Sequence, residues 1–113
     1  MDGFIIVFCT VPSRETGMII AENLVSGGYA ACVNIVPGLT SMYRWKGDIC
    51  RDDELLLIIK SRKQLFDDIC SRIKELHPYE APEILSFDIS GGSESYLQWL
   101  ADSTGMRCLY PGR

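Results

Sequence analysis

Apolar and polar residues alternate with different periods along this chain, and the changes of period predict strands and helices in turn. Four stretches are rich in β-branched or aromatic residues and predict strands: residues 4–10, 30–45, 48–60 and 83–89. Lys46 and Gly47 are a turn signal between the second and third strands, so these two strands form a long hairpin. Pro37 and Gly38 interrupt the second strand and indicate a bulge.

Helices are expected between and after these strands. Each begins near a serine that can cap its N-terminus: Ser13, Ser61 and Ser93. The first helix is expected to end at Gly27. Ser61 with Gln64 forms a capping-box pattern for the second helix, which ends where Pro78 follows His77.

The order of these elements, β-α-β-β-α-β followed by a helix, predicts an α+β fold. It is the ferredoxin-like (split βαβ) sandwich with an extra C-terminal helix, in which two helices cover one face of an antiparallel sheet. A length of 113 residues with 47% hydrophobic content predicts a single domain over residues 1–113. Because the first and third strands are apolar on both faces, we expect further copies of the chain to cover the second face. Residues 106–113 are a candidate for a last short strand.

Charge and cysteine spacing argue against several classes of function. The net charge is −4 and the basic residues are scattered, which argues against a nucleic-acid partner. The N-terminus has neither the basic region nor the length of an export or membrane segment, so we expect a cytoplasmic protein without a membrane partner. The five cysteines form no CxxC pair and predict reduced thiols: Cys9, Cys32, Cys50, Cys70 and Cys108. No catalytic constellation or phosphate-binding loop is recognisable, so no enzyme is expected.

Residues 77–83 gather the only histidine, His77, with two prolines and the carboxylates of Glu80 and Glu83. The prolines stiffen the segment, and stiff loops with such side chains are typical of binding sites and subunit contacts. The first strand and the second helix run in the same direction, so Cys9 and His77 reach the same edge of the sheet. A thiolate and an imidazole suit copper or zinc. The alternatives are a buried, inert thiol and an imidazole that favours the helix C-terminus.

Several longer stretches together carry a resemblance to a known family. They are residues 10–12, 30–38, 40–47, 59–60, 77–83 and 96–99. In this order, over about residues 5–100, they resemble the CutA family of divalent-cation tolerance proteins. The resemblance implies a cytosolic homotrimer of ferredoxin-like subunits associated with tolerance to copper and other divalent metals.

The resemblance also implies candidate metal ligands. Members put forward as copper binders have a cysteine at the end of the first strand and histidines just before the His-Pro-Tyr segment. Cys9 and His77 occupy these places, although this chain has Leu76 where such members carry a second adjacent histidine. Glu80 or Tyr79 is the nearest further donor in the sequence. The predicted ligand is copper or another divalent cation.

The remaining polar and aromatic residues are expected at subunit contacts or in solvent. Contacts are predicted for the residues of the hairpin tip and the 77–83 segment: Tyr43, Arg44, Trp45, Tyr79 and Glu83. Glu80 or Glu83 is expected to meet Arg44 or Lys60 of another subunit. The run Asp52-Asp53-Glu54 indicates a solvated edge. A second function stays open: a trimeric signalling or assembly module that binds a small molecule at clefts between subunits.

Overall fold

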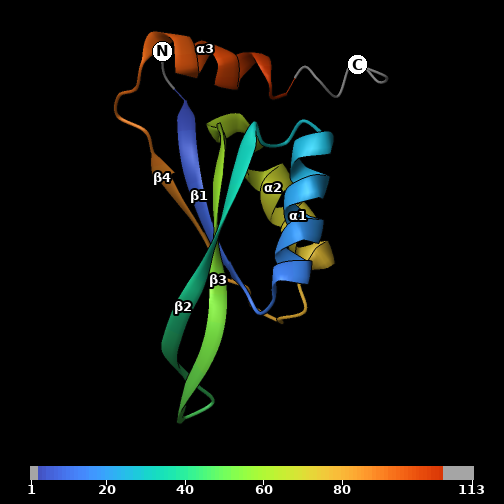
Figure 1. The fold of residues 1–113 in the computed structure, drawn as a ribbon, viewed down its shortest axis with the longest axis vertical. Helices are drawn as coiled ribbons and strands as arrows, with labels where there is room; N and C mark the ends of the chain where they lie inside the picture. Colours follow the sequence, from blue (N-terminus) through green and yellow to red (C-terminus); the bar gives the residue numbers. More distant parts are fainter. Residues whose placement is uncertain (1–2, 106–113) are drawn as a thin grey trace.

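Four antiparallel strands in the order β2-β3-β1-β4 form the sheet of this protein (Figure 1). The computed structural model describes residues 3–105. The helices and strands are β1 (Phe4–Val11), α1 (Arg14–Ser26), β2 (Cys32–Trp45), β3 (Asp48–Arg62), α2 (Phe66–Leu76), β4 (Ile84–Asp88) and α3 (Glu94–Asp102). The predicted order of elements and the α+β class are confirmed. The strand suggested for residues 106–113 lies outside the described part.

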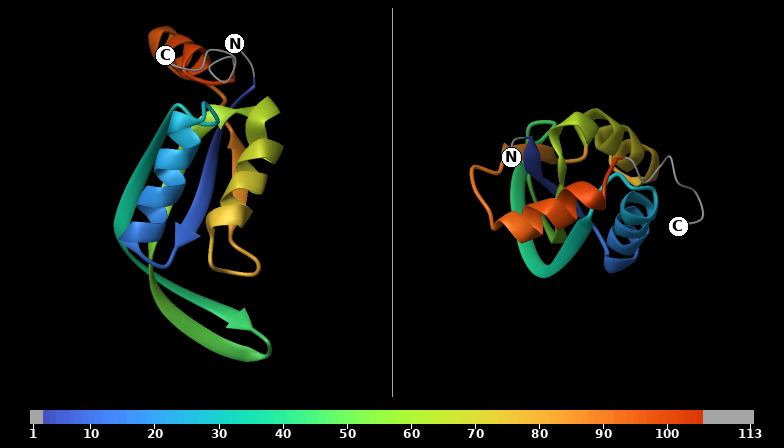
Figure 2. Two further views of the ribbon diagram at one scale, coloured as in Figure 1. Left: turned by 90° about the vertical axis from the view of Figure 1, so that its right-hand side faces the viewer. Right: turned by 90° about the horizontal axis from the view of Figure 1, so that it is seen from above.

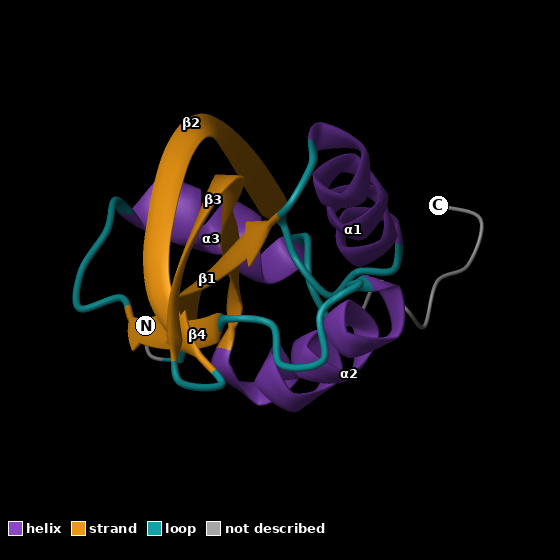
Figure 3. Ribbon diagram, turned by 90° about the horizontal axis from the view of Figure 1, so that it is seen from below, coloured by secondary structure: helices purple, strands orange, loops and turns teal. Residues whose placement is uncertain are grey.

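Helices α1 and α2 cover one face of the sheet, as Figures 2 and 3 show from three directions. Side chains from alternate positions of β1 point toward them, because successive strand residues face opposite sides. The buried core contains residues of β1, β3 and both helices: Ile5, Val7, Cys9, Val11, Ile20, Leu24, Ala30, Leu57, Ile59, Ile69 and Ile73. None of the helices within residues 3–105 has the length and apolar composition that a bilayer span needs.

The third helix closes one end of the sheet. Figure 1 shows α3 across the end opposite the hairpin tip. Leu97 and Leu100 of α3 form a second buried cluster with Phe4 and Ala31. The helix begins at Ser93, whose side chain accepts a hydrogen bond from the Tyr96 backbone N–H, so this predicted cap is confirmed.

The β2-β3 hairpin extends well beyond the rest of the sheet, and the molecule measures 45 × 31 × 23 Å (Figure 1). Lys46 and Gly47 have φ values of 50° and 88° at its tip. Positive φ at both central residues characterises the tight turn whose twist matches that of the strands. The predicted bulge is also confirmed, because the register shifts between Val36 and Leu39 and Gly38 has a φ of 83°.

The start of the second helix differs from the sequence-based prediction. Ser61 belongs to β3, where it pairs with Ile5, and its hydroxyl donates to the carbonyl of Tyr29 at 2.5 Å. A 3₁₀ turn over Lys63–Leu65 follows, and α2 begins at Phe66 without a side-chain cap. The predicted capping box is therefore wrong. Burial of Ser61 between strands outweighed its local preference for a helix end.

The face of the sheet opposite α1 and α2 is apolar and lacks a helix among the described residues. Ile6 pairs with Phe87, and Phe8 pairs with both Leu85 and Ile58, so these side chains share that face. The rings of Phe8 and Phe87 lie 5.0 Å apart in an edge-on contact. Leu85 and Phe87 remain 53% and 48% exposed.

Candidate functional site

His77 joins the end of α2 to the end of β1. Pro78 prevents the helix from continuing, and His77 takes an extended backbone conformation with its N–H donating to Ile73. Its buried ring lies 2.8 Å from the carbonyl oxygen of Thr10 through Nε2, and Nδ1 accepts the backbone N–H of Tyr79 at 3.1 Å. Because Nδ1 accepts, Nε2 carries the proton and donates to Thr10. Both ring nitrogens are therefore engaged.

Cys9 lies beside the same carbonyl. Its thiol is fully buried in the core and donates a weak hydrogen bond to the Thr10 oxygen at 3.7 Å. Burial, followed by the nearby Glu83 and Glu54 carboxylates, raises the pKa of the Cys9 thiol to about 12. The structure thus brings Cys9 and His77 together, as the strand and helix directions predict. The thiol is nevertheless protonated and unreactive at neutral pH.

The predicted metal ligands do not fit a resident metal ion in this arrangement. Coordination requires a thiolate and a free imidazole lone pair, whereas Cys9 is protonated and His77 uses both nitrogens. Glu80 is exposed on the loop. Within residues 3–105, no three or more histidine, cysteine, aspartate or glutamate side chains are grouped so that they could hold a metal ion.

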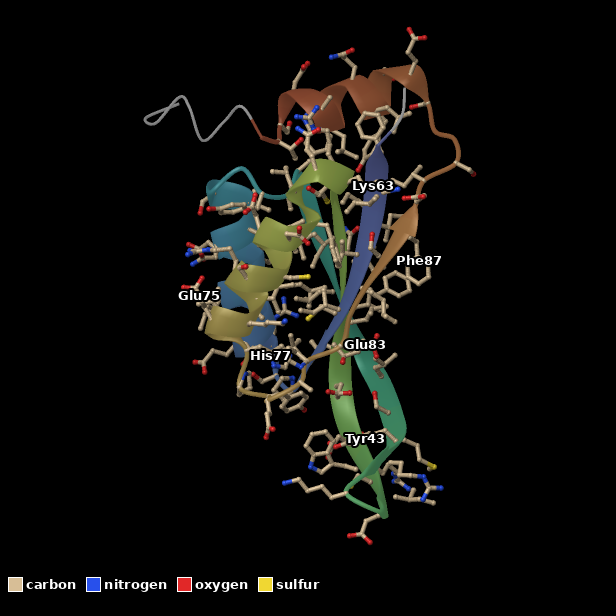
Figure 4. The ribbon with its side chains drawn as sticks, turned by 180° about the vertical axis from the view of Figure 1, so that it is seen from behind. Tyr43, Lys63, Glu75, His77, Glu83 and Phe87 are labelled. Atoms are coloured by element: carbon tan, nitrogen blue, oxygen red, sulfur yellow. The ribbon has the colours of Figure 1, made fainter. Side chains whose placement is uncertain are left out.

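A cleft of about 580 Å³ lies between the hairpin and the 77–83 segment. Figure 4 shows Tyr43 on the hairpin arm, below Glu83 and His77. Aromatic and acidic side chains line much of it: Tyr43, Trp45, Glu54, Tyr79, Glu80 and Glu83. Four of the five predicted contact residues therefore share this cleft, and the fifth, Arg44, is exposed on β2. Their role between subunits stays a prediction.

Two tyrosine hydroxyls donate hydrogen bonds to carboxylates of the β2-β3 hairpin. One tyrosine belongs to the 77–83 segment and the other to the hairpin itself. The Tyr79 hydroxyl donates to Glu54 Oε2 at 3.1 Å, and the Tyr43 hydroxyl donates to Asp52. Burial and then the hydrogen bond to Glu54 raise the pKa of Tyr79 to about 12. The hydrogen bond to Asp52 is the main cause that raises the pKa of Tyr43 to about 12. Both phenols thus remain donors at neutral pH.

The prediction that Glu54 belongs to a solvated edge is wrong. It is only 6% exposed, whereas Asp53, its neighbour, is exposed. The strand period places Asp52 and Glu54 on one face, and this signal could have marked them as a pair. The burial itself depends on Tyr79, which is distant in the sequence.

The fold and the cleft define a class: a small α+β subunit with a two-helix layer, an extended hairpin and an uncovered apolar sheet face. Comparison with known proteins gives the family. Residues 5–103 match the model of the CutA1 divalent ion tolerance protein family, and the chain belongs to it.

Relatives and solved structures agree with this assignment. The divalent-cation tolerance protein CutA of Thermus thermophilus is 50% identical over 100 residues, which span 88% of this chain and 97% of the relative. The chloroplastic CutA of Arabidopsis thaliana is 46% identical, and the match covers 88% of this chain and 55% of that longer protein. The structure of the T. thermophilus protein superposes with a TM-score of 0.89 at 49% identity and covers 90% of this chain and 99% of its own. The structure of CutA1 from Oryza sativa superposes with a TM-score of 0.89 at 45% identity and covers 91% of this chain and 94% of its own.

Proposed function

We propose that this chain is a cytoplasmic divalent-cation tolerance protein that acts as a homotrimer of ferredoxin-like subunits. Copper or another divalent cation is the ion to which it responds. Membership of the CutA1 family supports the tolerance function. The observation that carries the proposed assembly is the apolar sheet face that no helix of the described chain covers.

Exposed apolar side chains lie on that face and on the β2-β3 hairpin, besides others on α1 and α3. Leu85 and Phe87 lie beside Phe8 on the face, while Met42 and Ile49 of the hairpin are 68% and 70% exposed. Each buried Å² of such surface stabilises an assembly by about 25 cal/mol, less the cost of association. Neighbouring subunits that cover the face and receive the arm would bury these side chains together.

The metal ion in this proposal is a transient ligand of the trimer rather than a resident cofactor. The atoms of Cys9 and His77 that could bind a metal already take part in hydrogen bonds to the Thr10 carbonyl, and the one from His77 joins the end of α2 to β1. We assign no reaction to the protein. Its contribution to tolerance is binding and assembly.

Two measurements test the proposal. Sedimentation equilibrium at micromolar concentration should give three times the 12.7 kDa subunit mass. Calorimetry and native mass spectrometry of the reduced protein with Cu(I), Cu(II) and Zn(II) should detect an ion bound to the trimer. A stable monomer contradicts the assembly, and a trimer that takes up none of the ions contradicts the metal response.

A second candidate is a trimeric signalling or assembly module that binds a small molecule in its clefts. The observation that favours it is the cleft of about 580 Å³, a size typical of small-molecule sites. A screen of nucleotides, small anions and metabolites against the same protein separates this candidate from metal binding.

A further inference from the structure

The cleft beside the hairpin is lined by aromatic and negatively charged side chains. Its lining includes the rings of Tyr43, Trp45 and Tyr79 and the carboxylates of Glu54 and Glu83. None of the described residues that line it is lysine, arginine or histidine. A cavity with aromatic walls and only negative charges repels anions and favours a positively charged ligand.

Glu54 gives the clearest reason for a cation. The residue is only 6% exposed, and its Oε2 accepts a hydrogen bond from the Tyr79 hydroxyl. Within residues 3–105, Oε1 accepts no hydrogen bond and no basic group lies within 4 Å of the carboxylate. The carboxylate therefore has an oxygen available to a ligand and no counter-charge among the described residues, and a cation in the cleft would supply one.

The aromatic residues select among cations. The Lys46 ammonium lies 5.8 Å from the centre of the Trp45 ring, so this indole already attracts a cation. Ring faces bind organic ammonium groups, and quaternary ammonium ligands are typically held by several rings. A strongly hydrated metal ion would instead require several oxygen ligands at short distance. No such group of ligands is present in the described chain.

We infer that the cleft binds a small organic cation of the ammonium class. The charge pairs with the free oxygen of Glu54, and the alkyl substituents pack on the aromatic walls of the cleft. This inference names the ligand class for the second candidate function and rests on that candidate. It does not depend on metal binding.

The test follows Trp45 fluorescence in the full chain with Trp99→Phe, which removes the other tryptophan. Choline is titrated against 3,3-dimethylbutan-1-ol, a neutral molecule of nearly the same shape. Choline should change the fluorescence saturably, at a concentration at least about tenfold lower than the neutral molecule requires. This comparison needs no substitution in the cleft and so does not depend on the folding of any site variant.

Substitutions then test whether the Glu54 carboxylate is the group that binds the ammonium charge. Glu54→Gln should weaken choline binding at least about tenfold. Glu94→Gln, at the start of α3 and away from the cleft, is the matched control and should leave binding unchanged. A folded Glu54→Gln protein that binds choline like the parent overturns the inference.

Other outcomes also decide the question. Equal binding of both molecules, or no response to choline, overturns it. A response to ATP alone overturns the cation preference but leaves the second candidate function standing. Choline binding that appears only in Arg44→Gln means that an arginine of a neighbouring subunit fills the cleft, which also overturns it. Sedimentation of the same samples reports the trimer separately.

Discussion

The imidazole of His77 donates a hydrogen bond to the carbonyl oxygen of Thr10 across 2.8 Å. This contact closes the end of α2 onto the end of β1 and fixes the start of the 77–83 segment. The second ring nitrogen accepts the Tyr79 N–H, which sets the direction in which that segment leaves the helix. The only histidine of the chain therefore positions the loop that forms one wall of the cleft.

Replacing His77 with alanine should destabilise the subunit by about 2–4 kcal/mol, because the buried Thr10 carbonyl and the part-buried Tyr79 N–H both lose their partner. Urea unfolding measures the change in free energy. Glu75→Ala, exposed on the last turn of the same helix, is the control and should change stability by less than about 0.5 kcal/mol. An equally small effect of His77→Ala would show that the two hydrogen bonds contribute little.

Cys9→Ala should leave the Cu(I) affinity of the reduced protein within about threefold of the parent, because the buried, protonated thiol is not available as a ligand. Competition with a chromophoric Cu(I) chelator measures the affinity. Cys70→Ser, on the second helix, serves as the comparison variant. A loss of about tenfold or more in Cys9→Ala alone, the size expected when a metal site is disturbed, would support the soft site predicted from the sequence.

Stability should fall as the pH rises from about 9 toward 12. The folded pKa of Cys9 is about 12 against an ordinary value of 9.0, so the thiol ionises first in the unfolded chain. Its contribution is complete below pH 9 and is lost as the pH approaches 12. Denaturant unfolding over this range, compared with Cys9→Ala, isolates the thiol from the tyrosines. An unchanged pH slope in the variant would assign the alkaline loss to other groups.

Phe87→Glu should dissociate the proposed trimer, because it places a charge on the apolar sheet face beside Phe8. Sedimentation velocity measures the assembly. Met18→Glu, similarly exposed but on the outer surface of α1, is the matched control and should remain trimeric. If Phe87→Glu sediments like the control, another surface joins the subunits.

Trp45→Ala should weaken the assembly by about 2 kcal/mol or more if the arm anchors in a neighbouring subunit. The expectation rests on the position of Trp45 at the exposed end of the long β2-β3 hairpin. Dilution series followed by sedimentation give the change in association free energy. A variant that dissociates over the same concentration range as the parent would limit the role of Trp45 to the cleft.

Local sequence patterns were sufficient to predict the element order, the hairpin turn, the bulge and two helix caps. Lys46 with Gly47, the Pro37-Gly38 pair and the serines at 13 and 93 act through neighbours a few residues away. Strand and helix periods are local in the same sense, because each face is set by spacing along one element. The family resemblance likewise depended only on residues in order along the chain.

Tertiary structure decided the chemistry of the polar residues. Ser61 became a strand residue, Glu54 became a buried carboxylate, and His77 and Cys9 shared the carbonyl of Thr10. Each of these outcomes depends on a partner that is distant in sequence and on how completely packing removes water. A side chain's hydrogen bonds and the cost of its charge follow from that burial, which no local pattern specifies.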